Sequence, residues 1–444
     1  METQAVSDRA SATMRAMTLP DLGPFPDESG YDEAVALDQA DPLGEHRSRY
    51  LHSDPDLIYL DGNSLGRLPL AAAETVEEVT VRQWGGRLIR SWNEGWWDLQ
   101  LRLGDKLAPL LGAGPGEVII SDATSVNLYK LAHAAVTSMP PSRDKIVTDD
   151  LNFPSDVYIL QSVAAQTGRQ LEVVVSDGIQ GPVEALGEAI DEHTALVSLS
   201  HTVFQSGYTY DLAGMTRTAH QAGAMILWDC SHSVGAMPID LESAGVDLAV
   251  GCTYKHLNGG PGSPAFLYVR ESLQDRLVNP IAGWWSHAAP FSLDLEYRPV
   301  SGIRKFHTGT MPILALAAIE AGIDDVRDAT IEAIRAKSTA LSGYLLEQFR
   351  LHLKPLGFEL ASPLDPKLRG SHVSIRHEHA WPIDRAMIDL AKVIPDFRAP
   401  DIIRIGLSPL YNRFVDIHTA VQRTARIVTS QAYEEFSDVV SNVT

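Results

Sequence analysis

Residues 224–262 read AMILWDCSHSVGAMPIDLESAGVDLAVGCTYKHLNGGPG, and this stretch decides the fold class. The apolar run Ala224–Trp228 predicts a buried strand that ends at Asp229. A second run, Asp247–Gly251, predicts the neighbouring strand one strand–helix–strand step later, with Lys255 four residues beyond its end. Because ligands bind beyond the carboxyl ends of parallel strands, this carboxylate and this lysine indicate a site at one edge of a sheet.

The same alternation continues on the N-terminal side of this stretch. Short β-rich runs that end in polar loops predict further strands at Glu117–Ile120, Lys145–Thr148, Leu171–Val175 and Ala195–Leu199. Amphipathic runs between them predict helices at Val126–Val136, Val183–Ile190 and Leu212–Ala222. Strands that alternate with helices are typical of an α/β domain with a mainly parallel sheet.

The two ends of the chain follow different patterns. Four prolines punctuate the polar first 50 residues, which predict an arm with one helix near Tyr31–Gln39. Helical periodicity dominates from Ile313 to about Phe349, and the remaining residues mix short strands with helices. We therefore expect an arm at 1–55, a large α/β domain at 56–312 and a smaller α+β domain at 313–444.

Composition excludes several classes of protein. The 36 Lys and Arg residues against 57 Asp and Glu residues give a net charge of −21, which repels nucleic acid and anionic membrane surfaces. Cys230 and Cys252 are the two cysteines, too few for a disulfide scaffold and without the spacing of a zinc site. No apolar run has the length of a secretory signal or a membrane-spanning helix, so we expect a cytoplasmic protein with no metal.

Polar residues follow nearly every predicted strand. They are Thr124 and Ser125, Asp156 at the end of the run Phe153-Pro-Ser-Asp156, Ser200, Asp229 with His232, and Tyr254 with Lys255. Taken singly, each has an ordinary explanation: Thr124 and Ser125 could cap a helix, and Asp229 could pair with a structural arginine. Together they predict one polar rim along the carboxyl edge of the sheet.

This set matches what pyridoxal phosphate requires. A lysine forms the Schiff base, a carboxylate pairs with the pyridine nitrogen, a helix N-terminus holds the phosphate and an aromatic ring covers the cofactor. Lysines are mostly solvated surface charges, but Lys255 lies between an apolar strand and a glycine-rich turn. The chain has no GxxxxGK[ST] motif and no GxGxxG motif after a first strand, so competing phosphate signatures are absent.

The motifs of this chain resemble those of the kynureninase family from about residue 50 to the C-terminus. The motifs are Asp61-Gly-Asn-Ser-Leu-Gly66, Ile89-Arg-Ser-Trp92, Phe153-Pro-Ser-Asp156, Trp228-Asp-Cys-Ser-His-Ser-Val-Gly235, Cys252-Thr-Tyr-Lys-His-Leu-Asn-Gly-Gly-Pro-Gly-Ser263, Gly283-Trp284, Arg369-Gly-Ser-His-Val373 and Arg404-Ile-Gly-Leu-Ser-Pro-Leu-Tyr411. The resemblance implies fold type I with a seven-stranded sheet, a homodimer, and hydrolysis of L-kynurenine, with 3-hydroxykynurenine as a second substrate, to an anthranilate and L-alanine.

The resemblance also implies roles for individual residues. The catalytic set is Lys255, Asp229 and Tyr254, of which Lys255 carries the cofactor and Tyr254 is a candidate acid. Implied cofactor contacts are Thr124, Ser125, Phe153, Asp156, Ser200, Asp229, His232, Tyr254, Lys255, Trp284 and Thr310, with Trp284 from the same chain or from the other subunit. Ser64 and Arg404 are implied in substrate binding, because a guanidinium fork matches the α-carboxylate.

Departures from the family pattern leave the exact activity open. His256 stands where Tyr is common, and Trp285-Ser286 replaces Phe-Gly beside the expected substrate pocket. These changes are compatible with an enzyme that acts on a substituted kynurenine or another amino acid in a secondary pathway. The same fold could also serve a cysteine desulfurase, an aminotransferase or a non-enzymatic binding protein. A desulfurase would need a mobile nucleophilic cysteine, and Cys230 and Cys252 directly adjoin the predicted site segments.

Overall fold

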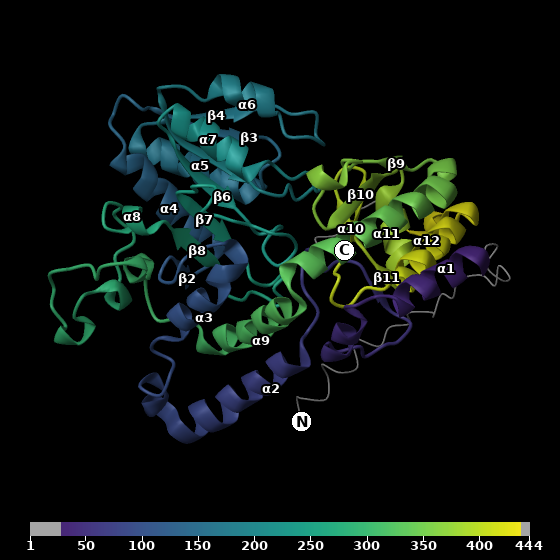
Figure 1. Cartoon of the computed structure of the whole chain (residues 1–444), viewed down its shortest axis with the longest axis horizontal. Coiled ribbons are helices and arrows are strands. Elements are labelled where there is room, and N and C mark those ends of the chain that lie inside the picture. Colours follow the sequence, from purple (N-terminus) through teal and green to yellow (C-terminus); the bar gives the residue numbers. More distant parts are fainter. Residues whose placement is uncertain (1–27, 437–444) are drawn as a thin grey trace, which may run out of the picture.

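The computed structural model describes residues 28–436. Part of the expected arm, residues 1–27, lies outside this range, and the predicted first helix is α1, Glu28–Gln39. Figure 1 shows two bodies side by side, one around a large central sheet and a smaller one that contains both α1 and the C-terminal helix α12, Phe414–Thr429. No helix within the described range combines the length and the apolar character needed to span a membrane.

The central sheet has seven strands in the order β2-β8-β7-β6-β5-β3-β4. Their bounds are β2 Val118–Ile120, β3 Lys145–Asp149, β4 Gln170–Val174, β5 Thr194–Ser200, β6 Met225–Asp229, β7 Leu248–Gly251 and β8 Phe266–Val269. Strands β4, β3, β5, β6 and β7 pair in parallel, whereas β8 is antiparallel to both of its neighbours. The prediction of a mainly parallel sheet is confirmed, and β8 is the strand that sequence patterning did not find.

Helices cover both faces of this sheet because alternate strand residues point to opposite sides. On one face, Ile119 and Leu196 join a cluster with residues of α4, Thr124–Ser138, and α5, Pro154–Thr167. On the other, Val118 and Val197 join a cluster with α3, α6, α7 and α9, whose bounds are Leu99–Leu107, Val183–Ala189, Leu212–Gln221 and Ile313–Ala329. Helices α4 and α5 begin directly after β2 and β3, so their N-termini face the carboxyl edge of the sheet.

One local expectation was wrong, and one predicted helical stretch is divided in two. The connection between β6 and β7 contains turns and no helix, because Gly235 and Gly245 have φ values of 74° and 73° and Pro238 lies between them. The helical run from Ile313 divides into α9 and α10, Ile331–Gln348. Thr330 lies between these helices with a φ of 63°, and its side chain caps α10 by accepting from the backbone N–H of Ala333.

The smaller body contains a four-stranded antiparallel sheet in the order β12-β13-β10-β9. These strands are β9 Glu359–Leu360, β10 His372–Arg376, β12 Asp396–Arg398 and β13 Ile402–Gly406, and α11, Ala380–Asp389, packs beside them. A short parallel pair, β1 Ile58–Tyr59 with β11 Val393–Ile394, brings the chain after α1 against this body. As a result, Ile58 and Leu60 join its apolar cluster, whereas Leu316 and Ile319 of α9 pack against the large sheet.

Candidate active site

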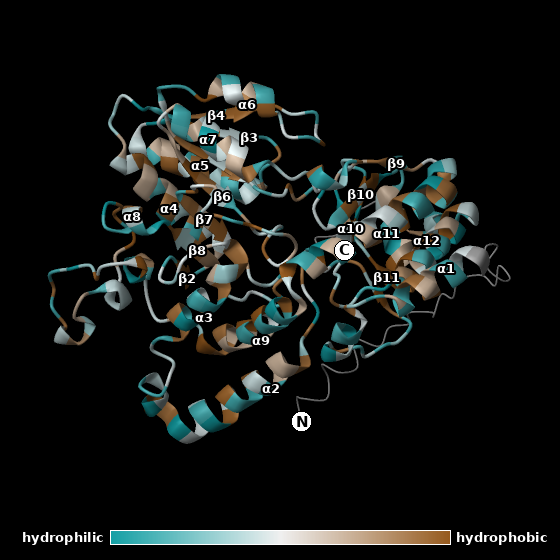
Figure 2. Cartoon of the chain, viewed as in Figure 1, coloured by the Kyte–Doolittle hydropathy of each residue, from teal (hydrophilic) through white to brown (hydrophobic). Residues whose placement is uncertain are grey.

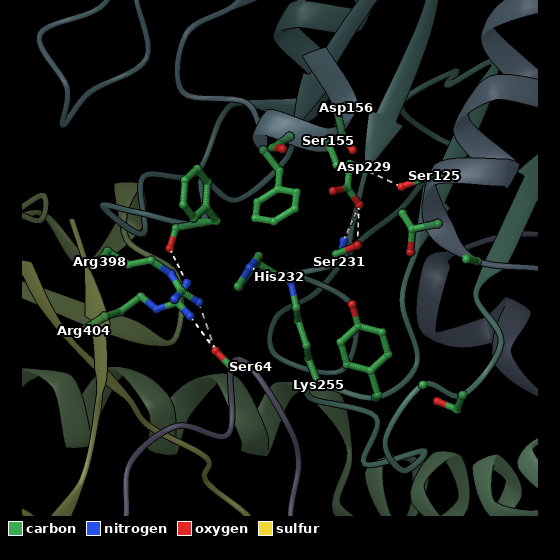
Figure 3. Close-up of a pocket in the computed structure, with 18 residues that line it drawn as sticks. Ser64, Ser125, Ser155, Asp156, Asp229, Ser231, His232, Lys255, Arg398 and Arg404 are labelled. Carbon is green, nitrogen blue, oxygen red and sulfur yellow. Dashed lines mark hydrogen bonds between the residues drawn. The ribbon is translucent and has the colours of Figure 1, made fainter. Parts of the chain in front are cut away.

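A cavity of about 340 Å³ lies at the carboxyl edge of the large sheet, next to the smaller body. Figure 3 shows its side chains converging from both bodies. The cavity is lined by Ser64, Ala123, Thr124, Ser125, Phe153, Ser155, Asp156, Ser200, Phe204, Asp229, Ser231, His232, Tyr254, Lys255, Gly262, Ser263, Arg398 and Arg404. The structure therefore brings together every predicted site residue except Trp284 and Thr310.

Two carboxyl groups form one end of the cavity. Asp229 is the last residue of β6, and its Oδ1 accepts hydrogen bonds from the backbone N–H (2.9 Å) and hydroxyl (2.6 Å) of Ser231. Asp156, in the first turn of α5, is 2% exposed, and its Oδ2 has no hydrogen-bond partner within the described range. Burial and the adjacent Asp229 raise the pKa of Asp156 well above its usual range. Ionisation of Asp156 beside Asp229 is therefore disfavoured at this end of the cavity.

Lys255 occupies the centre of the cavity. Its Nζ lies 2.8 Å from Nε2 of His232, and Figure 3 shows the two side chains meeting there. Burial and the charge of Lys255 hold the pKa of His232 well below its usual range, so a neutral ring can accept a hydrogen bond from Nζ. The neighbouring Cys252 and burial raise the pKa of Tyr254, which keeps that phenol protonated and able to donate a proton.

The N-terminus of α4 forms a second end of the cavity. Ala123 is the N-cap residue and offers no side-chain cap to the first backbone N–H groups of the helix. Hydroxyls gather around this helix start: Ser125 and Ser155 lie 2.8 Å apart, and Ser263 lies 2.7 Å from Thr253. Free N–H groups, the positive end of a helix dipole and nearby hydroxyls form a suitable site for a phosphate group.

Two phenylalanine rings stand at the cavity wall between its ends. Phe153 precedes α5 and is 43% exposed, so its ring is available to cover a flat ligand. It meets Phe204 edge to face, with ring centroids 5.2 Å apart. Ser200, the last residue of β5, donates its hydroxyl hydrogen to Asn152, which fixes that side chain against the cavity.

The third end of the cavity carries positive charge from the smaller body. Arg404 on β13 is 1% exposed, and its guanidinium donates to the hydroxyl of Ser64 (2.6 Å) and pairs with Asp396. Arg398 lines the same wall and pairs with the other oxygen of Asp396 at 2.8 Å. Asp61 lies 4.0 Å from Arg404, and burial followed by the charge of Asp396 raises its pKa to about 7.

Trp284 and Thr310 lie away from the cavity in the single chain. Trp284 is 43% exposed and packs against Trp97 and Phe291, with ring centroids 5.9 Å and 6.1 Å away. Thr310 is exposed and does not line the cavity. Trp285, expected beside the substrate pocket, is buried and stacks on Trp97 at 4.2 Å.

Sequence reasoning missed several residues of the cavity wall. Ser155, Ser231 and Ser263 lie within or beside motifs that were recognised, so their nearness in sequence to Asp156, His232 and the glycine-rich turn was an available signal. Phe204 and Arg398 gave no comparable signal. Arg398 is the last residue of the short strand β12 in the smaller body, and the packing of that body places it beside Ser64.

The three ends of the cavity fit the parts of one cofactor and its substrate. The α4 N-terminus suits a phosphate, Asp229 suits a protonated pyridine nitrogen, Lys255 suits a carbonyl carbon, and Arg404 suits a carboxylate. The buried Asp156 beside Asp229 adds a further polar group to the end of the cavity that suits the pyridine nitrogen. The fold and the cavity define a pyridoxal-phosphate-dependent enzyme of fold type I.

Comparison with known proteins supports this class and narrows it. The fold is similar to that of a cysteine desulfurase from Thermococcus onnurineus NA1, with a TM-score of 0.70, 19% identity, and coverage of 93% of this chain and 100% of that chain. It is also similar to a C-DES mutant with glycine covalently linked to its PLP cofactor, with a TM-score of 0.72, 18% identity, and coverage of 84% and 97%. At this identity the two structures show the fold alone.

The sequence relatives are much closer. The chain is 43% identical over 406 residues to the kynureninase of Burkholderia pseudomallei (strain 1106a), which covers 90% of this chain and 96% of that protein. It is 40% identical over 410 residues to the kynureninase of Pseudomonas fluorescens, which covers 91% and 97%. Residues 334–424 match the kynureninase C-terminal domain. The chain belongs to the kynureninase family.

Proposed function

We propose that this protein hydrolyses the Cβ–Cγ bond of L-kynurenine to give anthranilate and L-alanine. The observation that carries the proposal is the placement of a lysine amine, a buried carboxylate and a buried guanidinium around one cavity of about 340 Å³. These groups are those needed to bind an amino acid through its amine and its carboxylate at the same time. Family membership and 43% identity to a kynureninase support the choice of substrate.

Each end of the cavity receives one part of the cofactor in this proposal. Thr124, Ser125 and the α4 N-terminus hold the phosphate, Asp229 pairs with the ring nitrogen and Phe153 covers the ring. Bound pyridoxal phosphate supplies an electron sink for the negative charge that develops at Cα. Asp156 lies buried beside Asp229, and its raised pKa gives this end of the cavity a carboxyl group that resists ionisation.

Proton movements centre on Lys255, His232 and Tyr254. With cofactor and substrate bound, Nζ of Lys255 would act as the base that removes the Cα proton. His232 lies 2.8 Å from Nζ and holds the amine in position. Tyr254 lines the same cavity, and its raised pKa keeps the phenol protonated, so it can supply the proton that Cβ of the alanine portion needs after the Cβ–Cγ bond breaks.

We also propose a homodimer in which Trp284 and Thr310 reach the partner's cavity. Large exposed apolar side chains project from residues 79–97 and 282–297, which we call the projecting surface: Val81, Trp84, Leu88, Ile89, Trp284, Phe291, Leu293 and Leu295. Figure 2 shows brown, hydrophobic segments in the long loop between α8, Glu271–Gln274, and α9. Leu293 on the projecting surface is 83% exposed. Clustered exposure of this kind is typical of a protein–protein interface. Free, buried Cys230 and Cys252 support a reducing, cytoplasmic location.

The chemistry of a cysteine desulfurase receives no support from this site. Cys230 and Cys252 are both fully buried and neither lines the cavity. Burial raises the pKa of both thiols, so neither is a ready thiolate nucleophile. The structural likeness to desulfurases therefore reflects the shared fold.

The proposal is tested by incubating the purified holoenzyme with L-kynurenine and, separately, with 3-hydroxy-L-kynurenine. We expect equal amounts of the anthranilate product and L-alanine, measured by fluorescence and by amino-acid analysis. Lys255→Ala should abolish turnover, whereas Lys392→Ala, which changes an exposed lysine paired with Asp54 at 3.0 Å, should retain it. Absence of both aryl products would refute the proposed function, and pyruvate in place of alanine would indicate an aminotransferase-type reaction.

A further inference from the structure

The guanidinium of Arg404 has little hydrogen-bonding capacity left for a substrate. Arginine carries five N–H hydrogens. When the side-chain amide of Asn63 is oriented with its oxygen toward Arg404, that oxygen accepts a hydrogen bond from Nε of Arg404 at 2.8 Å. One terminal nitrogen of Arg404 donates to Ser64 (2.6 Å) and to Asp396. The other terminal nitrogen donates to the backbone carbonyl of Phe204 at 2.7 Å. One N–H hydrogen remains, whereas a carboxylate is held best by two parallel N–H bonds.

Arg398 has the capacity that Arg404 lacks. One terminal nitrogen forms an ion pair with Asp396 (2.8 Å) and donates to the carbonyl of Phe397 (3.1 Å). The second terminal nitrogen makes only a long contact of 3.5 Å with Ser64, and Nε has no partner within the described range. Its side chain is 34% exposed, so it can shift toward a ligand at a lower cost than the enclosed Arg404.

Both arginines lie on one side of the cavity and share two partners. Figure 3 shows them together beside Ser64, across the cavity from Asp229. Asp396 binds each guanidinium through a different oxygen, so it neutralises one of the two positive charges. Burial and Asp396 raise the pKa of Asp61 to about 7 and that of Asp384 to about 8, which limits further neutralisation at neutral pH. A net positive charge therefore remains on this side of the cavity for an incoming carboxylate.

We propose that Arg398 is a second substrate-binding residue that grips the α-carboxylate together with Arg404. Arg404 supplies one N–H bond from a fixed position, and Arg398 supplies the remaining bonds and the uncompensated charge. The hydroxyl of Ser64 lies between the two guanidinium groups and contacts both, which holds them beside each other. The inference rests on the proposed function, because it takes the ligand to be an amino acid bound through its carboxylate.

The test compares holoenzymes that carry Arg398→Gln, Arg398→Lys or Arg385→Gln. Arg385 is the matched control: it removes one charge from the same body, pairs with Asp389 at 3.1 Å and does not line the cavity. We expect Arg398→Gln to raise KM for L-kynurenine about 10- to 100-fold with kcat changed by less than about threefold. Arg398→Lys should fall between Gln and wild type, and Arg385→Gln should match wild type.

Two binding measurements separate a direct contact from a structural effect. The dissociation constant of L-alanine, followed by the absorbance of the holoenzyme, should rise about 10- to 100-fold in Arg398→Gln. The inhibition constant of kynurenamine, which lacks the α-carboxylate, should stay unchanged. An unchanged KM and L-alanine constant, or equal weakening of kynurenamine, would overturn the proposal. If wild type fails to turn over L-kynurenine, the proposed function falls, and the L-alanine constants still decide the role of Arg398.

Discussion

A buried ion pair beneath the phosphate end of the cavity gives the sharpest stability prediction. Lys130 on α4 is 0% exposed, and its ammonium donates to Asp122 (2.8 Å), to the carbonyl of Phe306 (2.7 Å) and to Ser121 (3.4 Å). Asp122 also accepts from the hydroxyl of Thr308 at 3.0 Å. The pair therefore connects the turn before α4 with the segment that leads to Thr310.

Replacing Lys130 with methionine keeps the volume of the side chain but leaves Asp122 without its cation. Removing one partner of a buried pair costs about 3–5 kcal/mol, because the remaining charge stays in a poorly solvated site. Lys145→Met is the matched control: that lysine is 16% exposed and pairs with Asp191 (3.0 Å) and Glu172 (3.2 Å), so its loss should cost about 1 kcal/mol or less. The double change Lys130→Met with Asp122→Asn should cost clearly less than the two single changes added together.

The assay is urea unfolding of the holoenzyme, followed by tryptophan fluorescence at one fixed chain and cofactor concentration, since both concentrations shift the midpoint. Because Asp122 directly precedes the N-cap of α4, Lys130→Met should also weaken retention of pyridoxal phosphate during dialysis. The reasoning is refuted if Lys130→Met destabilises no more than Lys145→Met, or if the double variant shows simple additivity.

Three further predictions concern stability and assembly. Asp384 is fully buried, and neither of its carboxyl oxygens has a hydrogen-bond partner within the described range. Its pKa of about 8 exceeds the usual 3.8, so as pH rises the folded chain keeps a proton that the unfolded chain releases. Asp384→Asn should therefore stabilise the protein, and the gain in free energy of unfolding should grow between pH 5 and pH 8 by up to about 1.4 kcal/mol per pH unit. Thermal unfolding would contradict this if the stabilities of wild type and variant changed with pH in parallel. Gly322→Ala would place a Cβ 1.8 Å from the carbonyl oxygen of Leu257, near Lys255. This variant should therefore lose thermal stability, measured by melting, and bound cofactor, measured by absorbance. Gly343→Ala, whose Cβ would meet nothing within 4 Å, should lose neither. Ile89→Asp with Leu295→Asp, at positions 76% and 103% exposed on the projecting surface, should give a monomer in light scattering with lost activity, and an active dimer would argue against this interface.

The strands of the large sheet were predictable because their signal is local. Apolar runs such as Ile226–Trp228 and Leu248–Val250 are buried on both faces, so their composition alone marks them as strands. Strand β8 was not predicted because it follows a glycine-rich turn directly and so breaks the expected alternation of strands and helices. A run of four or five apolar residues fits a strand and a buried turn of helix equally well.

Site residues at strand ends were predictable for a related reason. Parallel strands deliver their C-terminal residues to one edge, so Ser200, Asp229 and Lys255 meet whatever the details of packing. Arg404 was recognised through its motif, but its partners were not. Ser64 lies 340 residues away, and Asp396 reaches Arg404 through the register of β12 against β13.

The sequence by itself determined the sheet, the cofactor-binding edge and the Lys255–Asp229 pair, because each depends on hydrophobic pattern and on residues that follow strands directly. Only the tertiary structure decided the environment of these groups. It set the raised pKa of Asp156, the occupied donors of Arg404, the spare donors of Arg398 and the position of Trp284 away from the cavity of its own chain. The physical reason is that burial, charge and hydrogen-bond partners arise where distant segments pack together, and no local pattern specifies which segments meet.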